Sequence, residues 1–297
     1  MKKNLAFIFP AFITDFTGKE LLFLESNRSD INKYLHRISG ALNLKLPHFT
    51  YESYFYREEL ASQLLAYSFS CAFSDLLKSK GLLPDYVAGY SMGVYASMYA
   101  SESISFEQGA RIIYEAFNLV RKLSETLIYG MGAVIGLTTE DTEALIKSKN
   151  LDVEIININN AHSLVVAGKS SDVKELLQDA KIEGALSVAE LTVNTPYHSK
   201  YLIEYSNDFK NYLDNVCAGA PVIPVISTYN QRVVKSVGDI KTELVFNLTQ
   251  KINWHKTMQK LIDLGVTEMY ECGAGKGLKK ISRFIDGDYS LKTVYKI

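Results

Sequence analysis

The chain has 297 residues, of which 47% are hydrophobic and 22% are charged, and its formal net charge is −1. This composition predicts a globular protein of one large or two modest domains, and the lack of clustered Lys and Arg argues against nucleic acid or an anionic membrane as a partner. Three separate cysteines without metal-ligand spacing favour a reducing, cytoplasmic setting and a protein without a metal.

The first predicted element is a strand at residues 5–9, the apolar run Leu-Ala-Phe-Ile-Phe that Pro10 ends. An uninterrupted apolar run is typical of a parallel strand covered on both faces. The loop at residues 10–15 should then lie at the carboxyl end of this strand, where open α/β sheets place their sites. Residues 58–80 carry apolar side chains at three-to-four spacing before Gly81, which predicts an amphipathic helix.

Residues 85–96 read Asp-Tyr-Val-Ala-Gly-Tyr-Ser-Met-Gly-Val-Tyr-Ala, a Gly-x-Ser-x-Gly motif between a short strand and a helix. This context indicates a nucleophile elbow, a tight turn that strains Ser91 and presents its hydroxyl above the sheet. Glycine is needed at 89 and 93 because a side chain would collide with the neighbouring backbone. The Met92 N–H, at the start of the helix, could stabilise an oxyanion. A plain turn is the alternative for the five-residue pattern alone.

After a helix predicted at residues 105–128, with Ser105 as its cap, the pattern changes. The following elements are a strand at 131–137, a helix at 139–149, strands at 153–158 and 164–167, a helix at 170–181 and a strand at 186–191. This order is that of the ferredoxin-like, split βαβ unit. We therefore predict an α/β fold in which a large domain, residues 1–128 and 193–297, carries an inserted subdomain, residues 129–192.

The chain then returns to the large domain. The predicted elements are a helix at 199–216, a strand at 222–226, a helix at 244–264, a strand at 268–271 and, after the glycine-rich residues 272–277, a last helix and strand.

A nucleophilic serine needs a general base, and His198 is the best placed of the five histidines. It lies where the small subdomain returns the chain to the large domain, and such junctions form clefts. The alternative is that His198 only caps the helix that begins near residue 199. His162, in a hairpin loop, and His255, beside Trp254, are better explained as surface or packing residues.

Several motifs occur in a fixed order along nearly the whole chain: Phe7-Ile8-Phe9-Pro10, residues 88–93, Met131 to Leu137, Val165 to Gly168, Pro196 to Ser199, Ile252-Asn253-Trp254 and Glu271 to Lys276. Together they resemble the malonyl-CoA:acyl carrier protein transacylase family, and within it the stand-alone acyltransferases and acyl hydrolases of trans-acyltransferase polyketide synthases. The resemblance implies an α/β-hydrolase-like large domain with a mostly parallel sheet and an inserted ferredoxin-like subdomain.

The resemblance also implies a Ser–His mechanism, in which Ser91 attacks an acyl thioester and His198 takes the proton. The acyl group then passes to the phosphopantetheine thiol of an acyl carrier protein. Backbone carbonyls orient the histidine in this family, and Asn247 occupies the position of a family glutamine there. The N–H groups of Met92 and Phe12 would form the oxyanion hole. We expect acyl carrier protein as the partner, a monomer, and neither cofactor nor metal.

The departures from the family lie in the acyl pocket. Malonyl-selective members carry an arginine on the helix after the elbow, and counting from Ser91 places Ala116 there. Since a desolvated arginine–carboxylate pair is worth roughly 2–5 kcal/mol, its loss favours a neutral acyl group. Arg111 or Arg121 could restore the contact from a neighbouring turn, although neither points in the direction of residue 116. The other predicted pocket residues are Tyr90, Tyr197 and Asn160.

Two functions follow from these residues. The one we favour from the sequence is a proofreading acyl hydrolase that removes stalled acetyl or other neutral acyl groups from carrier proteins. The second is an acyltransferase that moves a neutral or unusual acyl unit from CoA or one carrier protein to another. Both share the formation of acyl-Ser91, so the sequence does not distinguish them. A scaffold that only docks carrier proteins would require Ser91 and His198 to lie apart.

Overall fold

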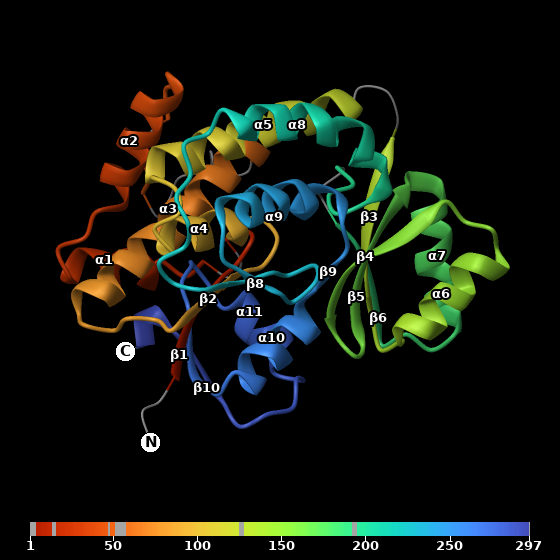
Figure 1. Cartoon of the computed structure of the whole chain (residues 1–297). Helices are drawn as coiled ribbons and strands as arrows, with labels where there is room; N and C mark the ends of the chain where they lie inside the picture. Colours follow the sequence, from red (N-terminus) through yellow and green to blue (C-terminus); the bar gives the residue numbers. More distant parts are fainter. Residues whose placement is uncertain are drawn as a thin grey trace.

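The structure is a computed structural model that describes residues 4–13, 16–46, 48–50, 58–124, 128–191 and 195–296. Over these residues it has a larger six-stranded sheet and a smaller five-stranded sheet, which lie side by side (Figure 1). The functional residues predicted from the sequence lie on segments that come from both sheets.

The larger sheet has the strand order β11-β10-β1-β2-β7-β8. Every neighbouring pair is parallel except β7 and β8, so the predicted mostly parallel sheet is confirmed. Its strands are β1 (Asn4–Phe9), β2 (Tyr86–Gly89), β7 (Val225–Ile226), β8 (Val233–Val234), β10 (Val266–Glu271) and β11 (Ser290–Thr293).

Strand β1 is buried on both faces, as its continuous apolar sequence predicts. Successive side chains of a strand point to opposite faces. Phe7 and Phe9 therefore pack in one core, and Ala6 and Ile8 pack in another. The first core contains residues of α1 (Lys19–Ser26), α2 (Ile31–Leu42), α3 (Glu59–Ser79), α4 (Gly93–Ala100), α5 (Phe106–Ser124), α8 (Ser206–Asp214) and α9 (Val237–Thr249), and the second contains residues of α10 (Trp254–Asp263) and α11 (Gly277–Ser282).

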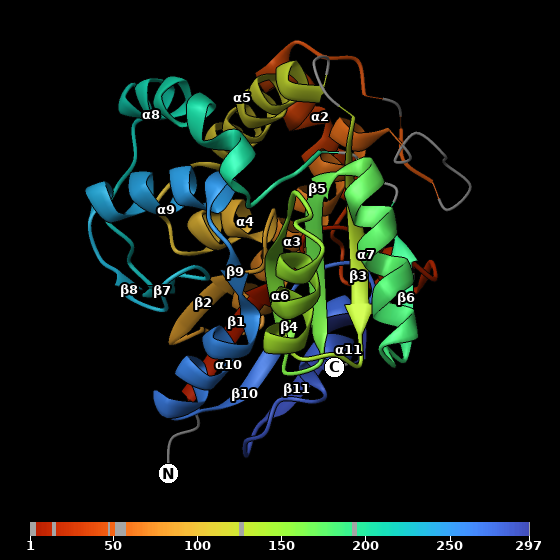
Figure 2. The ribbon, with the colours of Figure 1, turned by 90° about the vertical axis from the view of Figure 1, so that its right-hand side faces the viewer.

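The smaller sheet has the strand order β6-β3-β5-β4-β9, and its first four strands are antiparallel. This is the order of the predicted ferredoxin-like unit. The elements are β3 (Tyr129–Ile135), α6 (Thr139–Ser148), β4 (Val153–Asn160), β5 (Ser163–Lys169), α7 (Ser170–Ile182) and β6 (Ser187–Glu190). Helices α6 and α7 cover the face of this sheet that is turned away from the larger sheet (Figure 2).

The predicted helix at residues 244–264 is wrong. The structure instead has α9 and α10 separated by a short strand, β9 (Ile252–Asn253), which pairs in parallel with β4. The Asn253 side chain then caps α10 by accepting the Lys256 N–H at 2.9 Å. Helical periodicity in the sequence could not reveal this break, because the partner of β9 lies almost a hundred residues earlier in the chain.

Two further predictions need smaller corrections. The helix predicted at 199–216 begins as a 3₁₀ helix, η2 (Lys200–Tyr205), and continues as α8, while the strand predicted at 222–226 is reduced to β7. Pro221 and Pro224 lack the main-chain N–H that hydrogen bonds between neighbouring strands require, which explains why β7 is shorter than predicted. The helix predicted to reach residue 128 is described as far as Ser124, and residues 125–127 lie outside the described part. Helices α1 and α2 were not predicted.

Candidate functional site

Ser91 lies at the corner between β2 and α4, in a left-handed backbone conformation with φ of +54°. A non-glycine residue held in this region stores strain, as expected at a nucleophile elbow. A Cβ atom at Gly89 would lie 2.3 Å from backbone atoms of Gly93. One at Gly93 would lie 2.0 Å from the carbonyl oxygen of Phe9. Both glycines are therefore required for β1, β2 and α4 to approach so closely.

The Ser91 side chain meets His198 directly. Its Oγ lies 2.6 Å from His198 Nε2, and the two residues are only 8% and 4% exposed. The other ring nitrogen, Nδ1, contacts the main-chain carbonyl oxygen of Asn247. A carbonyl oxygen only accepts hydrogen bonds, so Nδ1 carries the ring proton and Nε2 accepts from the serine hydroxyl. This is the orientation that a general base needs.

Helix α9 holds the histidine at two points. The His198 N–H donates to the Leu248 carbonyl at 2.7 Å, while the preceding carbonyl of Asn247 binds the ring. Both carbonyls belong to the last turn of α9, where no later helical N–H can bind them. The end of one helix thus sets the position of the imidazole through main-chain atoms alone.

Burial lowers the pKa of His198 to about 4, and the hydrogen bond to the Asn247 carbonyl opposes this shift only in part. The imidazole is therefore neutral at pH 7, and its Nε2 lone pair is available to take a proton.

Two main-chain N–H groups were predicted to form the oxyanion hole, those of Met92 and Phe12. Met92 precedes α4 directly, and Phe12 lies in the loop after β1. The Tyr90 N–H donates to the Phe9 carbonyl at 2.9 Å, which attaches the elbow to the end of β1 just before this loop. Within the described residues, neither the Met92 N–H nor the Phe12 N–H has a hydrogen-bond partner. The Met92 N–H, at the start of α4, is suited to an oxyanion, and the Phe12 N–H remains a predicted second donor.

Tyr90 links the elbow to the smaller sheet. Its hydroxyl donates to Asn159 Oδ1 at 2.7 Å and accepts from Asn157 Nδ2 at 2.6 Å, both on β4. Its ring packs edge-on against Trp254, with 5.6 Å between centroids. The sequence analysis did not identify Asn157 and Asn159, although two asparagines at alternate positions of a strand place both amides on one face. These residues hold the two sheets together next to Ser91.

Asn160, which we predicted to line the acyl pocket, has other partners. Its amide donates to the Ile281 carbonyl of α11 at 2.9 Å, and its Oδ1 accepts the His162 N–H at 3.0 Å. Both polar ends of the side chain are thus engaged in holding the β4–β5 turn against α11. The asparagines beside the elbow are Asn157 and Asn159.

Tyr197, the residue before His198, ends in a buried hydrogen-bonded group. Its hydroxyl donates to Glu59 Oε1 at 2.9 Å and accepts from Gln63 Nε2 at 3.2 Å. Burial raises the pKa of Tyr197 and also that of the Glu59 carboxyl. Glu59 and Gln63 were not identified from the sequence. The available signal was a glutamine among the apolar positions of α3, where Gln63 is 1% exposed.

The model of the acyl transferase domain family matches residues 62–258 of this chain. The malonyl CoA-acyl carrier protein transacylase of Staphylococcus aureus (strain COL) is 30% identical over 218 residues, which cover 72% of this chain and 71% of the relative. The chain belongs to the malonyl-CoA:acyl carrier protein transacylase family. It is therefore an acyltransferase-family enzyme, and the α/β-hydrolase-like fold with a ferredoxin-like subdomain is confirmed.

Solved structures agree with this fold. The acyl-carrier-protein S-malonyltransferase of Burkholderia pseudomallei 1710b is 25% identical and superimposes with a TM-score of 0.89, covering 98% of this chain and 96% of that one. A malonyl-transacylase solved in complex with a type II polyketide synthase acyl carrier protein is 22% identical and has a TM-score of 0.89, with the same coverage of 98% and 96%.

In this acyltransferase, Ala116 of α5 is 2% exposed and lies in the large core that also contains Phe7 and Phe9 of β1. The arginines considered as replacements for a cation there both face solvent. Arg111 donates from Nε to the Ala41 carbonyl at 3.4 Å, at the surface between α5 and α2, and Arg121 is exposed near the end of α5. The alternative that one of these two arginines restores a cation beside Ala116 is therefore wrong.

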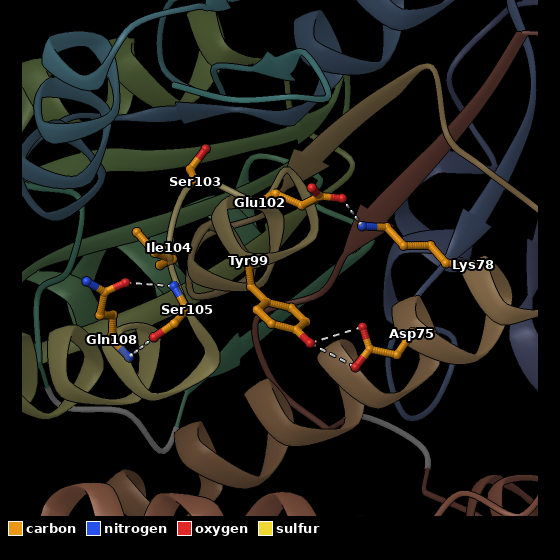
Figure 3. Close-up of a pocket in the computed structure, with 8 residues that line it drawn as sticks. All are labelled: Asp75, Lys78, Tyr99, Glu102, Ser103, Ile104, Ser105 and Gln108. Carbon is orange, nitrogen blue, oxygen red and sulfur yellow. Dashed lines mark hydrogen bonds and ion pairs between the residues drawn. The ribbon is translucent and has the colours of Figure 1, made fainter. Parts of the chain in front are cut away.

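A groove of about 440 Å³ reaches His198 between β4 and the end of α9, and Lys200, Thr249 and Gln250 also line it. A second hollow lies between α3, α4 and α5, where Asp75, Lys78 and Tyr99 meet and no predicted site residue is found (Figure 3).

Throughout the described ranges, each helix is too short or too polar to span a bilayer, and no cluster of three or more His, Cys, Asp or Glu could hold a metal ion.

Proposed function

We propose that this enzyme transfers an acyl group from an acyl thioester, through acyl-Ser91, to the phosphopantetheine thiol of an acyl carrier protein. The observation that carries the proposal is the 2.6 Å contact between Ser91 Oγ and the neutral, carbonyl-oriented ring of His198. A pair with this geometry activates a serine without a third acidic residue.

In the first half-reaction, Ser91 Oγ bonds to the thioester carbonyl carbon while His198 Nε2 takes the hydroxyl proton. The N–H groups of Met92 and Phe12 stabilise the oxyanion that forms. The carbon–sulfur bond then breaks, and the imidazolium gives its proton to the leaving thiolate. In the second half-reaction the acceptor thiol loses its proton to His198 and attacks acyl-Ser91. The serine then recovers that proton, so no other reactant is consumed.

The carrier protein is proposed as partner from the relatives. The Staphylococcus aureus relative is named for acyl carrier protein, and one structural neighbour is solved with such a protein bound. The motifs of the sequence further favour a stand-alone enzyme that serves a trans-acyltransferase polyketide synthase.

The acyl group is proposed to be neutral. A malonyl carboxylate placed beside buried Ala116 would lose its water and gain no cation, because Arg111 and Arg121 face solvent. An unpaired buried charge costs several kcal/mol. An acetyl or longer neutral chain incurs no such cost.

Hydrolysis of acyl-Ser91 is the second candidate. It is favoured by the same Ala116, since a chamber without a cation suits an enzyme that clears neutral acyl groups. Water could take the place of the acceptor thiol at His198 without any change in the catalytic pair. The family relatives are named as transacylases, however, so transfer is placed first, which reverses the preference drawn from the sequence.

One assay tests both candidates. Acetyl-loaded and malonyl-loaded carrier proteins are mixed with an isotope-labelled free carrier protein and the enzyme, and intact masses are followed. Migration of acetyl to the labelled protein is expected. Loss of acetyl as free acid would favour the hydrolase. If no acyl-Ser91 adduct forms and no acyl group moves, the proposed chemistry is contradicted. If malonyl moves faster than acetyl, the proposed substrate is contradicted.

A further inference from the structure

The backbone of His198 is strained, so its position depends on the contacts around it. Its φ is +63°, in the left-handed region that a non-glycine residue keeps only when its surroundings hold it there. The contacts that hold it include the carbonyls of Asn247 and Leu248, in the last turn of α9. A feature that fixes this turn relative to Ser91 therefore also fixes the base relative to the nucleophile.

Glu243 is a buried acid on α9, one helical turn before Asn247. It is 2% exposed, and its Oε1 accepts the main-chain N–H of Thr228 at 3.2 Å. Apolar side chains of α9 also pack in the core, but hydrophobic contacts have no preferred direction. A hydrogen bond has one, so the contact with Thr228 restricts how far α9 can rotate or slide.

Thr228 connects this contact to the sheet that carries Ser91. It follows β7 by two residues, and β7 pairs with β2, the strand that leads into the elbow. The Thr228 carbonyl also accepts the N–H of Asn253 in β9 at 2.8 Å. Figure 2 shows α9 next to β8 and leading into β9. One residue thus binds both ends of the segment 243–253, and the two carbonyls that hold His198 lie between these contacts.

Stability does not explain why an acid is buried here. Burial raises the pKa of Glu243 to about 7, and hydrogen bonds from the Ser227 hydroxyl and the Thr228 N–H oppose this shift only in part. Because this pKa lies above the ordinary value of 4.5, ionisation of the carboxyl favours the unfolded chain as the pH rises between the two values. Both protonation states keep an oxygen that can accept the Thr228 N–H, so the contact persists across neutral pH.

We propose that Glu243 is a positioning residue for the reaction at Ser91. By binding Thr228, its side chain holds the end of α9 in the place where the imidazole of His198 faces the serine hydroxyl. The inference rests on the proposed function, because the reaction that it supports is the acylation of Ser91. It goes beyond that function by adding a residue that acts on the base through a helix.

The test compares Glu243→Met, which removes the acceptor, with Glu243→Gln, which keeps an amide oxygen of the same reach. Acylation by a range of acetyl-CoA concentrations is followed by quenched flow and intact mass. Glu243→Met should lower the maximal rate about 10- to 100-fold and change the half-saturating concentration less than about threefold, because a displaced base slows proton transfer and not binding. Glu243→Gln should keep the maximal rate within about threefold. An unaltered rate in Glu243→Met, or an equal loss in both variants, would overturn the proposal.

A spectroscopic measurement reports the position of the ring without any substrate. The Nδ1 proton of His198, bound to the Asn247 carbonyl, should give a downfield proton resonance that is absent in His198→Ala. This resonance should shift or broaden in Glu243→Met and stay in place in Glu243→Gln. An unchanged resonance in Glu243→Met would contradict the inference.

A milder variant covers the case in which Glu243→Met does not fold. Glu243→Asp keeps the carboxyl but shortens the side chain by one methylene, so the acid reaches Thr228 less well. The maximal acylation rate should then fall about three- to tenfold, the loss expected when one hydrogen bond is weakened. A rate and a His198 resonance equal to those of the unaltered enzyme would overturn the proposal.

Asp239→Ala is the matched control on the same helix. Asp239 belongs to the capping box at the other end of α9, where its side chain accepts the Ser236 N–H at 3.0 Å. Loss of this cap should lower the melting temperature, yet acylation should stay within about threefold because the cap lies far from His198 along the helix. If Asp239→Ala slowed acylation as much as Glu243→Met, a general loosening of α9 would explain both results and the proposal would be wrong.

The two proposals fail in different ways. If acetyl-CoA leaves Ser91 unmodified in the unaltered enzyme, the proposed function fails, and the resonance of His198 still tests whether Glu243 positions the ring. If acetyl-CoA acylates Ser91 and Glu243→Met reacts equally fast, only the inference about Glu243 fails.

Discussion

The Ser91–His198 pair and the hydrogen-bonded group of Tyr197, Glu59 and Gln63 adjoin each other but are built in different ways. In the pair, main-chain geometry sets every position: the left-handed φ of Ser91, the close approach at Gly93, and the carbonyls of Asn247 and Leu248. In the group of Tyr197, Glu59 and Gln63, side chains make all three hydrogen bonds. The difference teaches that side chains next to the pair can be substituted while the main-chain contacts that position Ser91 and His198 stay the same.

The largest effect is expected at the nucleophile. Ser91→Ala should lower acyl transfer by more than about 10³-fold, because no other group can form the acyl-enzyme. The variant should also resist labelling by a serine-reactive phosphonate, measured by intact mass. Normal labelling of Ser91→Ala would show that another serine is the nucleophile and that the pair is not the catalytic centre.

The main-chain geometry that positions Ser91 can be tested at Gly93. Gly93→Ala places a Cβ 2.0 Å from the Phe9 carbonyl oxygen, so α4 must move away from β1. We expect a loss of about 1–3 kcal/mol in the free energy of unfolding and a fall in acylation rate of at least about 100-fold. Both would be measured on the purified variant, by urea unfolding and by adduct formation.

Gly40→Ala is the matched control for that prediction. Gly40 lies in α2, and a Cβ there would have no neighbour within 4 Å. Alanine in a helix interior should raise the free energy of unfolding by about 0.5–1 kcal/mol and leave acylation unchanged. Equal behaviour of the two alanine variants would contradict the steric argument for the elbow.

The contribution of a side chain to acyl preference can be tested at Ala116. Ala116→Arg should raise the malonyl-to-acetyl acylation ratio by about tenfold or more, because a guanidinium would pair with the malonyl carboxylate. Ala116→Met supplies similar bulk without charge and should leave the ratio low. Competition assays with malonyl and acetyl thioesters, run in parallel on both variants, would measure this ratio. A ratio that rises equally in both variants would show that charge is not the cause.

The pH profile tests the state of the imidazole. Because the pKa of His198 is lowered to about 4, kcat/KM should be nearly constant from pH 6 to 8. Below pH about 4 it should fall roughly tenfold per pH unit, since the protonated ring cannot take the serine proton. Acylation assays quenched after short times would measure kcat/KM at each pH. A midpoint near the ordinary histidine value of 6.5 would mean that the ring is more exposed to water than its burial indicates.

The smallest effect is expected at Asn247. Its carbonyl binds His198, whereas its side-chain Oδ1 is buried and has no partner among the described residues. Asn247→Ala should therefore change kcat/KM by less than about threefold, because the main-chain contact remains. A 100-fold loss would show that the side chain, and not the backbone, orients the imidazole.

Much of the fold could be predicted because its signals are local. The apolar run of β1, the Gly-x-Ser-x-Gly corner and the strand and helix order of the small subdomain each lie within a short stretch of sequence. The segment from α9 to α10 could not be predicted in the same way, since Ile252 and Asn253 are extended only because β4 pairs with them. The polar partners Glu59, Asn157 and Asn159 were missed for the same reason.

The sequence by itself indicated the family and predicted that Ser91 and His198 meet, because the Gly-x-Ser-x-Gly turn and the histidine motif are short local patterns. Only the tertiary structure decided that the Asn247 carbonyl holds the imidazole, that Tyr90 bridges to β4, and that the Tyr197 hydroxyl binds Glu59. Each of these depends on residues that are distant in the chain and meet only when the two sheets pack together.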